Sequence, residues 1–259
     1  MSHERHHAFT LAEIALTLAV LGLLIGGLLF GNGLIQAKER QSISVEYAGH
    51  KTAMATFRNK YLALPGDMTT ATRIWGSAGS TGKASDPACA NIPSPTATCD
   101  GDGNGRYNPQ ESLRAWQQLA NAGIIAGHFT GARANFSGYA HPFVATVNVP
   151  GSKHSPRAFW HALSSANQSA TNSSFSTVGW DNYFMLFSMN TPSITPGDAL
   201  KVDAKLDDGL PSTGTVVSSK GDGTTTFCTT MAGTATDAGA TYVLDNPNPD
   251  CHLYFIRAY

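Results

Sequence analysis

The sequence predicts an α+β fold in which one long N-terminal helix, its first half able to span a membrane, packs against an antiparallel β-sheet. Three observations predict this fold. An uncharged and mostly apolar run occupies residues 14–37. An amphipathic stretch of helical period follows it. Short segments rich in β-branched and aromatic residues, bounded by turn residues, then occupy much of the C-terminal half.

The first helix is expected to run from about Phe9 to Leu62, which is roughly 80 Å at 1.5 Å per residue. Its uncharged run, Ile14 to Ala37, contains 24 residues and measures about 36 Å, more than a bilayer core of about 30 Å. Pro65-Gly66 is the expected stop. Apolar side chains between run and stop recur every three, four or seven residues, which indicates one buried face: Ile43, Tyr47, Met54, Phe57, Tyr61 and Leu64.

A single acid marks the start of the apolar run. The leader Met1–Ala8 precedes the segment Phe9-Thr10-Leu11-Ala12-Glu13, and the apolar run begins directly after it. A carboxylate at the rim of a membrane helix is unfavourable unless it is paired, so Glu13 is a candidate functional residue. A plain membrane anchor or an uncleaved signal peptide is the alternative, although a secretory signal has an apolar region of only about 7–15 residues.

These residues resemble the N-terminus of the type IV pilins and the type II secretion pseudopilins, which have a short polar leader, then Phe-Thr-Leu-x-Glu and a long apolar helix. Ala8 stands where that family usually has Gly. The resemblance is specific over residues 1–65 and looser beyond them. It implies a leader over residues 1–8, a pilin helix over 9–64 that is transmembrane at about 14–37, and a globular periplasmic or extracellular head over 65–259.

The resemblance also implies how the chain would be processed and assembled. Prepilin peptidase would cut between Ala8 and Phe9, and the new Phe9 amine would be methylated. Glu13 of one subunit would pair with that amine on its neighbour, because a charge left unpaired in a low-dielectric helix bundle is unfavourable. The implied partners are other pilin subunits, prepilin peptidase, the inner-membrane assembly platform and the membrane. The implied location is the inner membrane, with a periplasmic head, and later a pilus or pseudopilus that can reach the cell surface.

Composition and cysteine content agree with an exported domain. Charged residues make up 14% of the chain and the net charge is −1, so no basic field favours nucleic acid. Four cysteines allow three pairings. Their short spacings favour Cys89–Cys99 and Cys228–Cys251, and such disulfides would persist outside the cytoplasm. Two reduced, buried pairs are the alternative.

The strongest site signal lies between Asp100 and Glu111, where the sequence fits the calcium-loop pattern D-x-[DN]-x-[DN]-G-x5-E at every defined position. Gly105 permits the sharp turn, and a helix over Ser112–Ala122 is expected to follow. No entering helix is expected, so a structural role for calcium is more natural than sensing. The alternative is an Asp/Gly/Asn turn without an ion. The expected ligands are Asp100, Asp102, Asn104, the Arg106 carbonyl, Asn108 through a water, and a bidentate Glu111.

The remaining elements are predicted from local patterns. Strands are expected at residues 143–149, 183–189, 215–219, 224–230, 241–244 and 251–259. Short helices are expected from Asp67 to Gly76 and from Pro196 to Leu206, the latter with Gly209 as its cap. Asp203, Asp207 and Asp208 form either a second cation site or a solvated helix face. The segment from Cys228 to Cys251 resembles the disulfide-bounded loop that closes many pilin heads.

The expected function is structural, and no enzymatic activity is expected. The chain would be a subunit of a type IV pilus or of a type II secretion pseudopilus, with calcium stiffening its head. A minor or tip pilin is the alternative within that class. A membrane-anchored calcium-binding recognition domain that never assembles is the alternative outside it.

Overall fold

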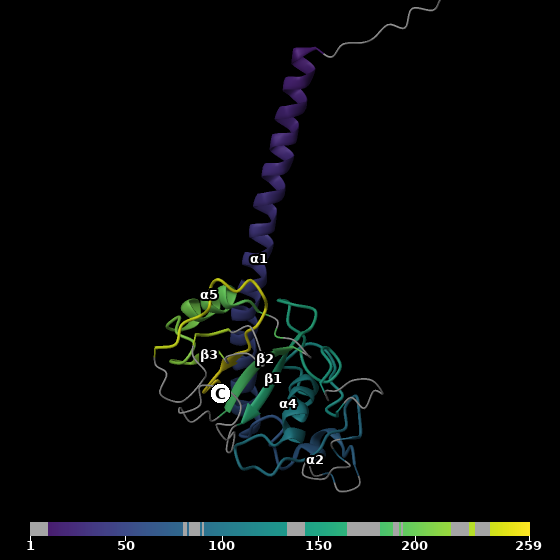
Figure 1. Cartoon of the computed structure of the whole chain (residues 1–259). Coiled ribbons are helices and arrows are strands. Elements are labelled where there is room, and N and C mark those ends of the chain that lie inside the picture. Colours follow the sequence, from purple (N-terminus) through teal and green to yellow (C-terminus); the bar gives the residue numbers. More distant parts are fainter. Residues whose placement is uncertain are drawn as a thin grey trace, which may run out of the picture. The chain divides into compact units, whose positions relative to one another are not determined.

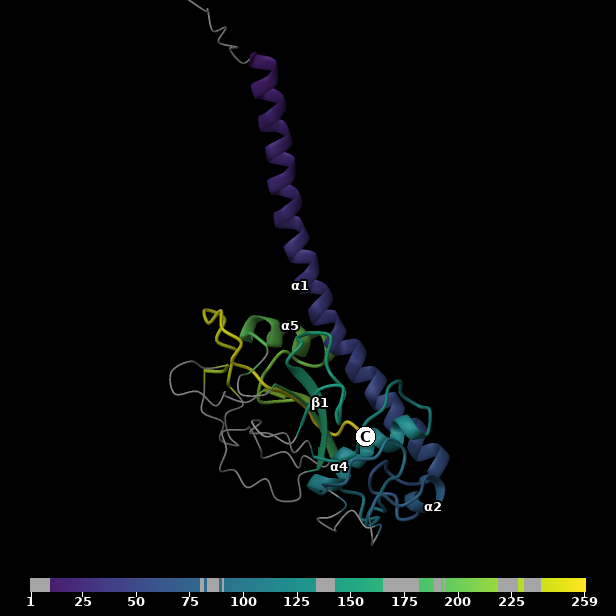
Figure 2. The same cartoon turned by 90° about the vertical axis from the view of Figure 1, so that its right-hand side faces the viewer.

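The computed structural model divides the chain into two compact units, and each is described by itself. The N-terminal unit ends at Glu39, and the globular unit comprises Arg40–Tyr259. Figures 1 and 2 show the labelled helices and strands of the globular unit. The residues that the structure describes are 10–79, 82, 89, 91–133, 143–164, 182–188, 192, 194–218, 228–230 and 239–259.

Helix α1 extends over Leu11–Tyr61 and confirms the predicted long N-terminal helix. At its C-terminal end the Leu62 amide still donates a helical hydrogen bond to the Arg58 carbonyl, four residues earlier, at 2.8 Å. Leu62 itself has a φ of 55°, in the left-handed region. A leucine is unfavourable there, and a helix cannot continue through that conformation. The helix therefore ends before the Pro65-Gly66 stop that the sequence indicates.

Four antiparallel strands form the sheet of the globular unit, in the order β1-β2-β4-β3. Strands β1 (Ala158–Ser164) and β2 (Asn182–Ser188) are seven residues each, whereas β3 (Val216–Ser218) and β4 (Leu253–Phe255) are three residues each. Phe184 of β2 is opposite Phe255 of β4, which is in turn opposite Val216 of β3. Aromatic and β-branched cross-strand pairs of this kind stabilise a sheet.

The second half of α1 packs against one face of this sheet. The ring of Tyr47 stacks on Phe255 with centroids 4.6 Å apart and meets the edge of Phe184 at 6.3 Å. Trp116 of helix α4 (Pro109–Asn121) stacks on the same Phe184 ring at 5.9 Å. Helices α1 and α4 therefore cover the same face, and the main hydrophobic core lies between them and the sheet (Figure 2).

One strand prediction is wrong, and one strand was not predicted. Residues 143–149 form a turn, because the Asn148 side chain accepts a hydrogen bond from the Val144 amide at 2.7 Å and closes the chain locally. Thr146 in this turn has a φ of 64°. Strand β1 was not expected from the sequence. Its first five residues are all buried, so they lack the period-two alternation that identifies a half-buried strand.

Three of the other strand predictions are confirmed in part, whereas residues 241–244 form no strand. β2 and β3 lie within one residue of the predicted starts, whereas β4 occupies only the middle of the predicted 251–259 strand, which ends in a turn. Within the predicted strands at 224–230 and 241–244, the described residues contain one isolated bridge, between Thr229 and Tyr242. Residues 224–227 lie outside the described part of the chain.

The short helices follow their local signals. Helix α2 (Ala71–Trp75) occupies the end of the predicted 67–76 segment. Helix α5 (Pro196–Leu206) has the predicted bounds, with Thr195 as its N-cap and Gly209 at a φ of 78°. Helix α4 begins three residues earlier than predicted, because Asn108 caps it. Both predicted disulfides, Cys89–Cys99 and Cys228–Cys251, are present.

Candidate cation-binding cluster and apolar helix

The loop after Cys99 is shaped by a buried carboxylate from outside it. Asp67 is 3% exposed. Its Oδ1 accepts hydrogen bonds from the amides of Gly103 (2.7 Å) and Asn104 (3.2 Å), and its Oδ2 accepts one from the Gly105 amide (2.8 Å). Gly103 and Gly105 have φ values of 74° and 78°, which glycine adopts without steric strain. These two glycines let three amides converge on one acid.

Glu111 enters the same region from the first turn of α4. The Asn108 side chain accepts hydrogen bonds from the amides of Gln110 (3.0 Å) and Glu111 (2.9 Å). In return, Glu111 Oε2 accepts one from the Asn108 amide at 2.9 Å, which completes a capping box. Glu111 Oε1 accepts a hydrogen bond from the Asp102 amide at 3.0 Å. The capping box thus fixes the Glu111 carboxylate against the loop.

Three carboxylates meet at this point. Asp67, Asp102 and Glu111 each offer an oxygen, and these oxygens lie within 4.8 Å of one another. Burial raises the pKa of Glu111 to about 7, and the neighbouring charges of Asp102 and Asp67 add to the effect. Burial also raises the pKa of Asp67. Carboxylate oxygens held together in this way suit a hard divalent cation, which would supply the missing positive charge.

The structure brings together two of the predicted ligands, Asp102 and Glu111, and adds Asp67. Asp100, the expected first ligand, lies elsewhere: its carboxylate accepts hydrogen bonds from the Thr72 amide at 2.7 Å and the Thr72 hydroxyl at 2.9 Å. The calcium-loop pattern did not include Asp67, because this residue lies far upstream of the loop. The one local signal at Asp67 was its position directly after Pro65-Gly66, which indicates a turn but not a ligand.

The other predicted ligands form hydrogen bonds within the loop and at the start of α4. The Asn104 side chain accepts a hydrogen bond from the Arg106 amide at 2.7 Å and donates one to Asp102 at 2.8 Å. Asn108 is the N-cap of α4. The acidic cluster could hold a metal ion, and the assignment to calcium stays a prediction.

A second acidic cluster lies at the end of α5. Oxygens of Asp203, Asp207 and Asp208 lie within 4.8 Å of one another. Asp203 is buried, accepts a hydrogen bond from the Tyr242 hydroxyl at 2.8 Å, and has its pKa raised to about 7 by that burial. Asp207 accepts a hydrogen bond from the Val216 amide at 3.0 Å. These acids fix the chain between α5 and β3, and a cation at this site also stays a prediction.

The N-terminal unit presents the second candidate feature. Helix α1 is long and apolar enough to cross a membrane by length and composition, with a mean hydropathy of 2.4 over its most apolar part. Leu23 is 77% exposed and Leu28 is 71% exposed. Glu13 lies at its start, where Oε2 accepts hydrogen bonds from the Thr10 amide (2.8 Å) and the Thr10 hydroxyl (2.9 Å). The predicted processing residues Ala8 and Phe9 lie outside the described residues.

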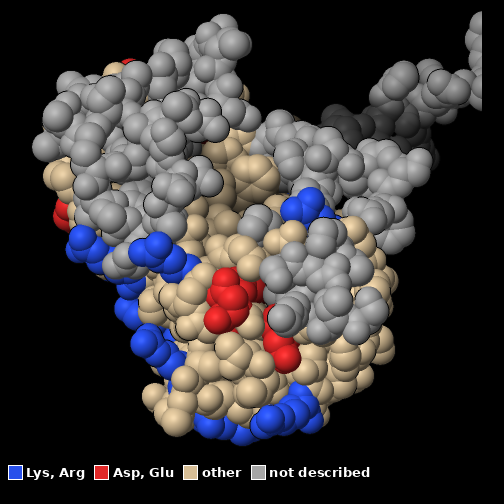
Figure 3. Space-filling view, turned by 90° about the horizontal axis from the view of Figure 1, so that it is seen from below, with Lys and Arg blue, Asp and Glu red and all other residues tan. Residues whose placement is uncertain are grey.

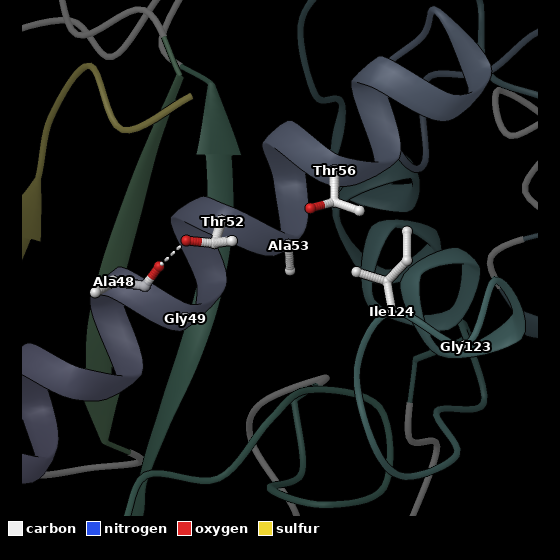
Figure 4. Close-up of a pocket in the computed structure, with 7 residues that line it drawn as sticks. All are labelled: Ala48, Gly49, Thr52, Ala53, Thr56, Gly123 and Ile124. Atoms are coloured by element: carbon white, nitrogen blue, oxygen red, sulfur yellow. Dashed lines mark hydrogen bonds between the residues drawn. The ribbon is translucent and has the colours of Figure 1, made fainter.

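The exposed side of α1 in the globular unit forms one wall of an open groove of about 510 Å³ (Figure 4). The Thr52 hydroxyl there donates to the Ala48 carbonyl at 2.8 Å. None of the described residues that line the groove is titratable. Its lining residues are small or aliphatic: Ala48, Gly49, Thr52, Ala53, Thr56, Gly123 and Ile124.

Charge is sparse on the face of the globular unit that Figure 3 shows. Figure 3 shows a small group of acidic side chains near the middle of that face, with Lys and Arg side chains around its margin. The described residues in this view form no broad basic field of the kind that binds nucleic acid.

No protein-family model, curated protein or solved structure matches this chain.

Proposed function

We propose that this chain is a structural subunit of a filament, a type IV pilus or a type II secretion pseudopilus, that assembles through α1 after removal of residues 1–8. The observation that carries the proposal is the exposed apolar part of α1 with Glu13 at its start. Exposed apolar surface of this extent is unfavourable in water. Membrane lipid would cover it first, and the helices of neighbouring subunits would cover it after assembly.

Glu13 supplies the specificity in this proposal. Apolar helices attract one another with little preference for register, whereas a carboxylate in a low-dielectric bundle needs a partner at one position. The Phe9 amine of a neighbour, freed by cleavage after Ala8, would be that partner. Within the subunit one Glu13 oxygen, Oε2, accepts both hydrogen bonds from Thr10. Local capping is therefore a competing explanation for Glu13, and the experiment must separate the two.

The acidic cluster would hold calcium and stiffen the globular unit. Asp67, Asp102 and Glu111 would be ligands, because their oxygens converge and burial leaves them short of positive charge. The same cluster favours a second candidate function, a membrane-anchored cation-binding recognition domain, since it needs no neighbouring subunit. In that case α1 would only anchor the chain.

Three variants of the first helical turn test the proposal. Glu13→Gln removes the charge but keeps an oxygen that can accept the Thr10 hydrogen bonds, since Gln also serves in a capping box. Thr10→Ala removes the hydroxyl partner but keeps the carboxylate. Glu13→Ala removes both charge and cap. The measurement is the amount of each variant in sheared, purified filaments relative to its amount in the membrane fraction.

We expect Glu13→Gln and Glu13→Ala to reach the membrane but to enter filaments poorly, and Thr10→Ala to enter at close to the wild-type level. If Glu13→Gln enters as well as wild type, the carboxylate serves only the helix cap and the proposed pairing with the Phe9 amine is wrong. If wild type itself reaches the membrane but does not enter filaments, the recognition-domain function is the better explanation.

A further inference from the structure

A polar face of helix α4 is buried against the ring of chain that the Cys89–Cys99 disulfide closes. Amphipathic helices usually expose such a face to solvent, yet Arg114, Gln117 and Gln118 are each 0% exposed. Backbone carbonyls of the ring accept hydrogen bonds from this face. Its four polar side chains follow the i, i+3, i+4, i+7 spacing of one helix side: Arg114, Gln117, Gln118 and Asn121.

Arg114 forms most of its hydrogen bonds with the ring. Its guanidinium donates to the carbonyls of Cys89 (2.5 Å), Ile92 (3.0 Å) and Ala97 (3.4 Å). It also donates to the Gln117 side-chain oxygen at 2.8 Å. Among the residues that the structure describes, no carboxylate forms an ion pair with it. A buried cation without a counter-charge is tolerated only while its hydrogen-bond acceptors stay in place.

The neighbouring side chains extend this contact along the ring. The Gln117 amide donates to the Ser94 carbonyl at 2.7 Å, and the Asn121 amide donates to the Thr96 carbonyl at 2.6 Å. The Gln118 amide donates to the Cys99 carbonyl at 3.2 Å. The face of α4 thus contacts the ring from Cys89 to Cys99.

The acidic cluster is attached to both parts of this assembly. Glu111 lies one turn before Arg114 on α4, and the chain leaving Cys99 passes directly into the loop that carries Asp102. The Gly101 amide after the ring donates to the Met68 carbonyl, next to Asp67, at 2.9 Å. A shift of α4 or of Cys99 would therefore move the cluster's carboxylates relative to one another.

We propose that the Cys89–Cys99 disulfide is a redox latch on the acidic cluster, with Arg114 as the residue that transmits its state to α4. With the ring closed, its carbonyls hold Arg114 and fix α4 and Glu111. With the ring open, Arg114 loses ordered acceptors and the first turn of α4 loosens. The cluster is then complete only after the chain has reached an oxidising compartment. This inference rests on the proposed function only in treating the cluster as a working part of the globular unit.

Closure of the latch requires an external disulfide oxidant, such as the disulfide of a thiol–disulfide oxidoreductase. One cysteine thiolate attacks that disulfide and forms a mixed disulfide. The second cysteine, as a thiolate, then displaces it and forms the Cys89–Cys99 bond. Two electrons and two protons pass from the cysteine pair to the oxidant, which leaves as a dithiol.

Amide hydrogen exchange on the full chain in detergent micelles tests the latch, with C89S/C99S as the variant and C228S/C251S as the matched control. Opening a ring of this size should raise exchange by up to about a hundredfold. In C89S/C99S we expect faster exchange at the amides of α4 and at the Gly103 and Gly105 amides, which donate to Asp67. Wild-type exchange rates at these amides would overturn the proposal. An equal rise in C228S/C251S would also overturn it, because the effect would then be global.

A second measurement applies to the oxidised chain and does not depend on the cysteine variants folding. In Arg114→Met the ring loses its main donors, so dithiothreitol should reduce Cys89–Cys99 about tenfold faster or more. Cys228–Cys251 in the same molecule should be reduced at its wild-type rate. In Arg114→Lys the rate of Cys89–Cys99 reduction should lie between those of wild type and Arg114→Met, since an ammonium lacks the guanidinium's rigid fork. An unchanged ratio of the two reduction rates would overturn the proposal.

Neither readout involves filament entry or cation binding. Failure of the latch and failure of the filament proposal are therefore distinguishable.

Discussion

Removing one charge from the acidic cluster should stabilise the cation-free protein at high pH. Glu111 is 0% exposed, and its carboxylate lies among those of Asp67 and Asp102. In Glu111→Gln the charge is gone, but one side-chain oxygen remains to accept the Asn108 amide of the capping box. The variant loses the hydrogen bond from the Asp102 amide, which contributes about 1 kcal/mol.

The magnitude follows from the raised pKa of Glu111. Its pKa is about 7 in the folded protein against a reference of 4.5. The folded state therefore binds the proton more tightly than the unfolded state does. Stability is greatest below the reference pKa and falls as the pH rises towards 7. A difference of about 2.5 in pKa corresponds to about 3 kcal/mol above pH 7. After subtraction of the lost hydrogen bond, Glu111→Gln should gain about 2 kcal/mol, or roughly 4–8 °C.

Thermal unfolding of the full chain in detergent at pH 5 and pH 8, with chelator or with millimolar calcium, checks this reasoning. We expect wild type to be destabilised at pH 8 in chelator and restored by calcium, and Glu111→Gln to respond weakly to both. Glu46→Gln is the control, because Glu46 binds Trp160 and Ser152 away from the cluster. If the wild-type melting temperature changes neither with pH nor with calcium, the claim that the cluster carries excess negative charge is wrong.

Three further predictions concern the globular unit. Gly66→Ala should lower the free energy of unfolding in urea by at least about 2 kcal/mol, because a Cβ there would lie 2.2 Å from the Glu111 carbonyl oxygen. In the control Gly123→Ala nothing lies within 4 Å of the added Cβ, so the loss should be only about 1 kcal/mol, from the left-handed backbone. Burial raises the pKa of Asp203 to about 7, so wild type should lose stability between about pH 4 and pH 7 as this carboxyl ionises. In Asp203→Asn this loss should be smaller, which the urea midpoints at pH 5 and pH 8 measure. Trp116→Ala should cost about 3–5 kcal/mol in the same assay, because this ring is 0% exposed in the core.

Elements with local signals were predictable from the sequence. Helix α5 is bounded by the Thr195 cap and by Gly209, both of which act within a few residues of the helix. The stripe behind the apolar run identified the buried face of α1, since Ile43, Met54 and Phe57 are each 0% exposed. The short cysteine spacings favoured the pairs that the structure contains.

Features that depend on distant contacts were not predictable. Strand β1 is buried along most of its length, so its sequence has no alternation to read. Asp67 joins the cluster only because folding places the segment that follows α1 beside the loop after Cys99. The burial of the polar side of α4 had no local signal in the sequence, because distant residues of the disulfide ring cover Arg114 and its neighbours.

The mature N-terminus tests the central claim most directly. Mass spectrometry of the chain, isolated from membranes and from any filaments that contain it, would identify its first peptide. The filament account predicts that this peptide begins at Phe9 and carries a methylated amine, the partner that Glu13 needs. A mature chain that still begins at Met1 would contradict the account, because Glu13 would then have no freed amine with which to pair.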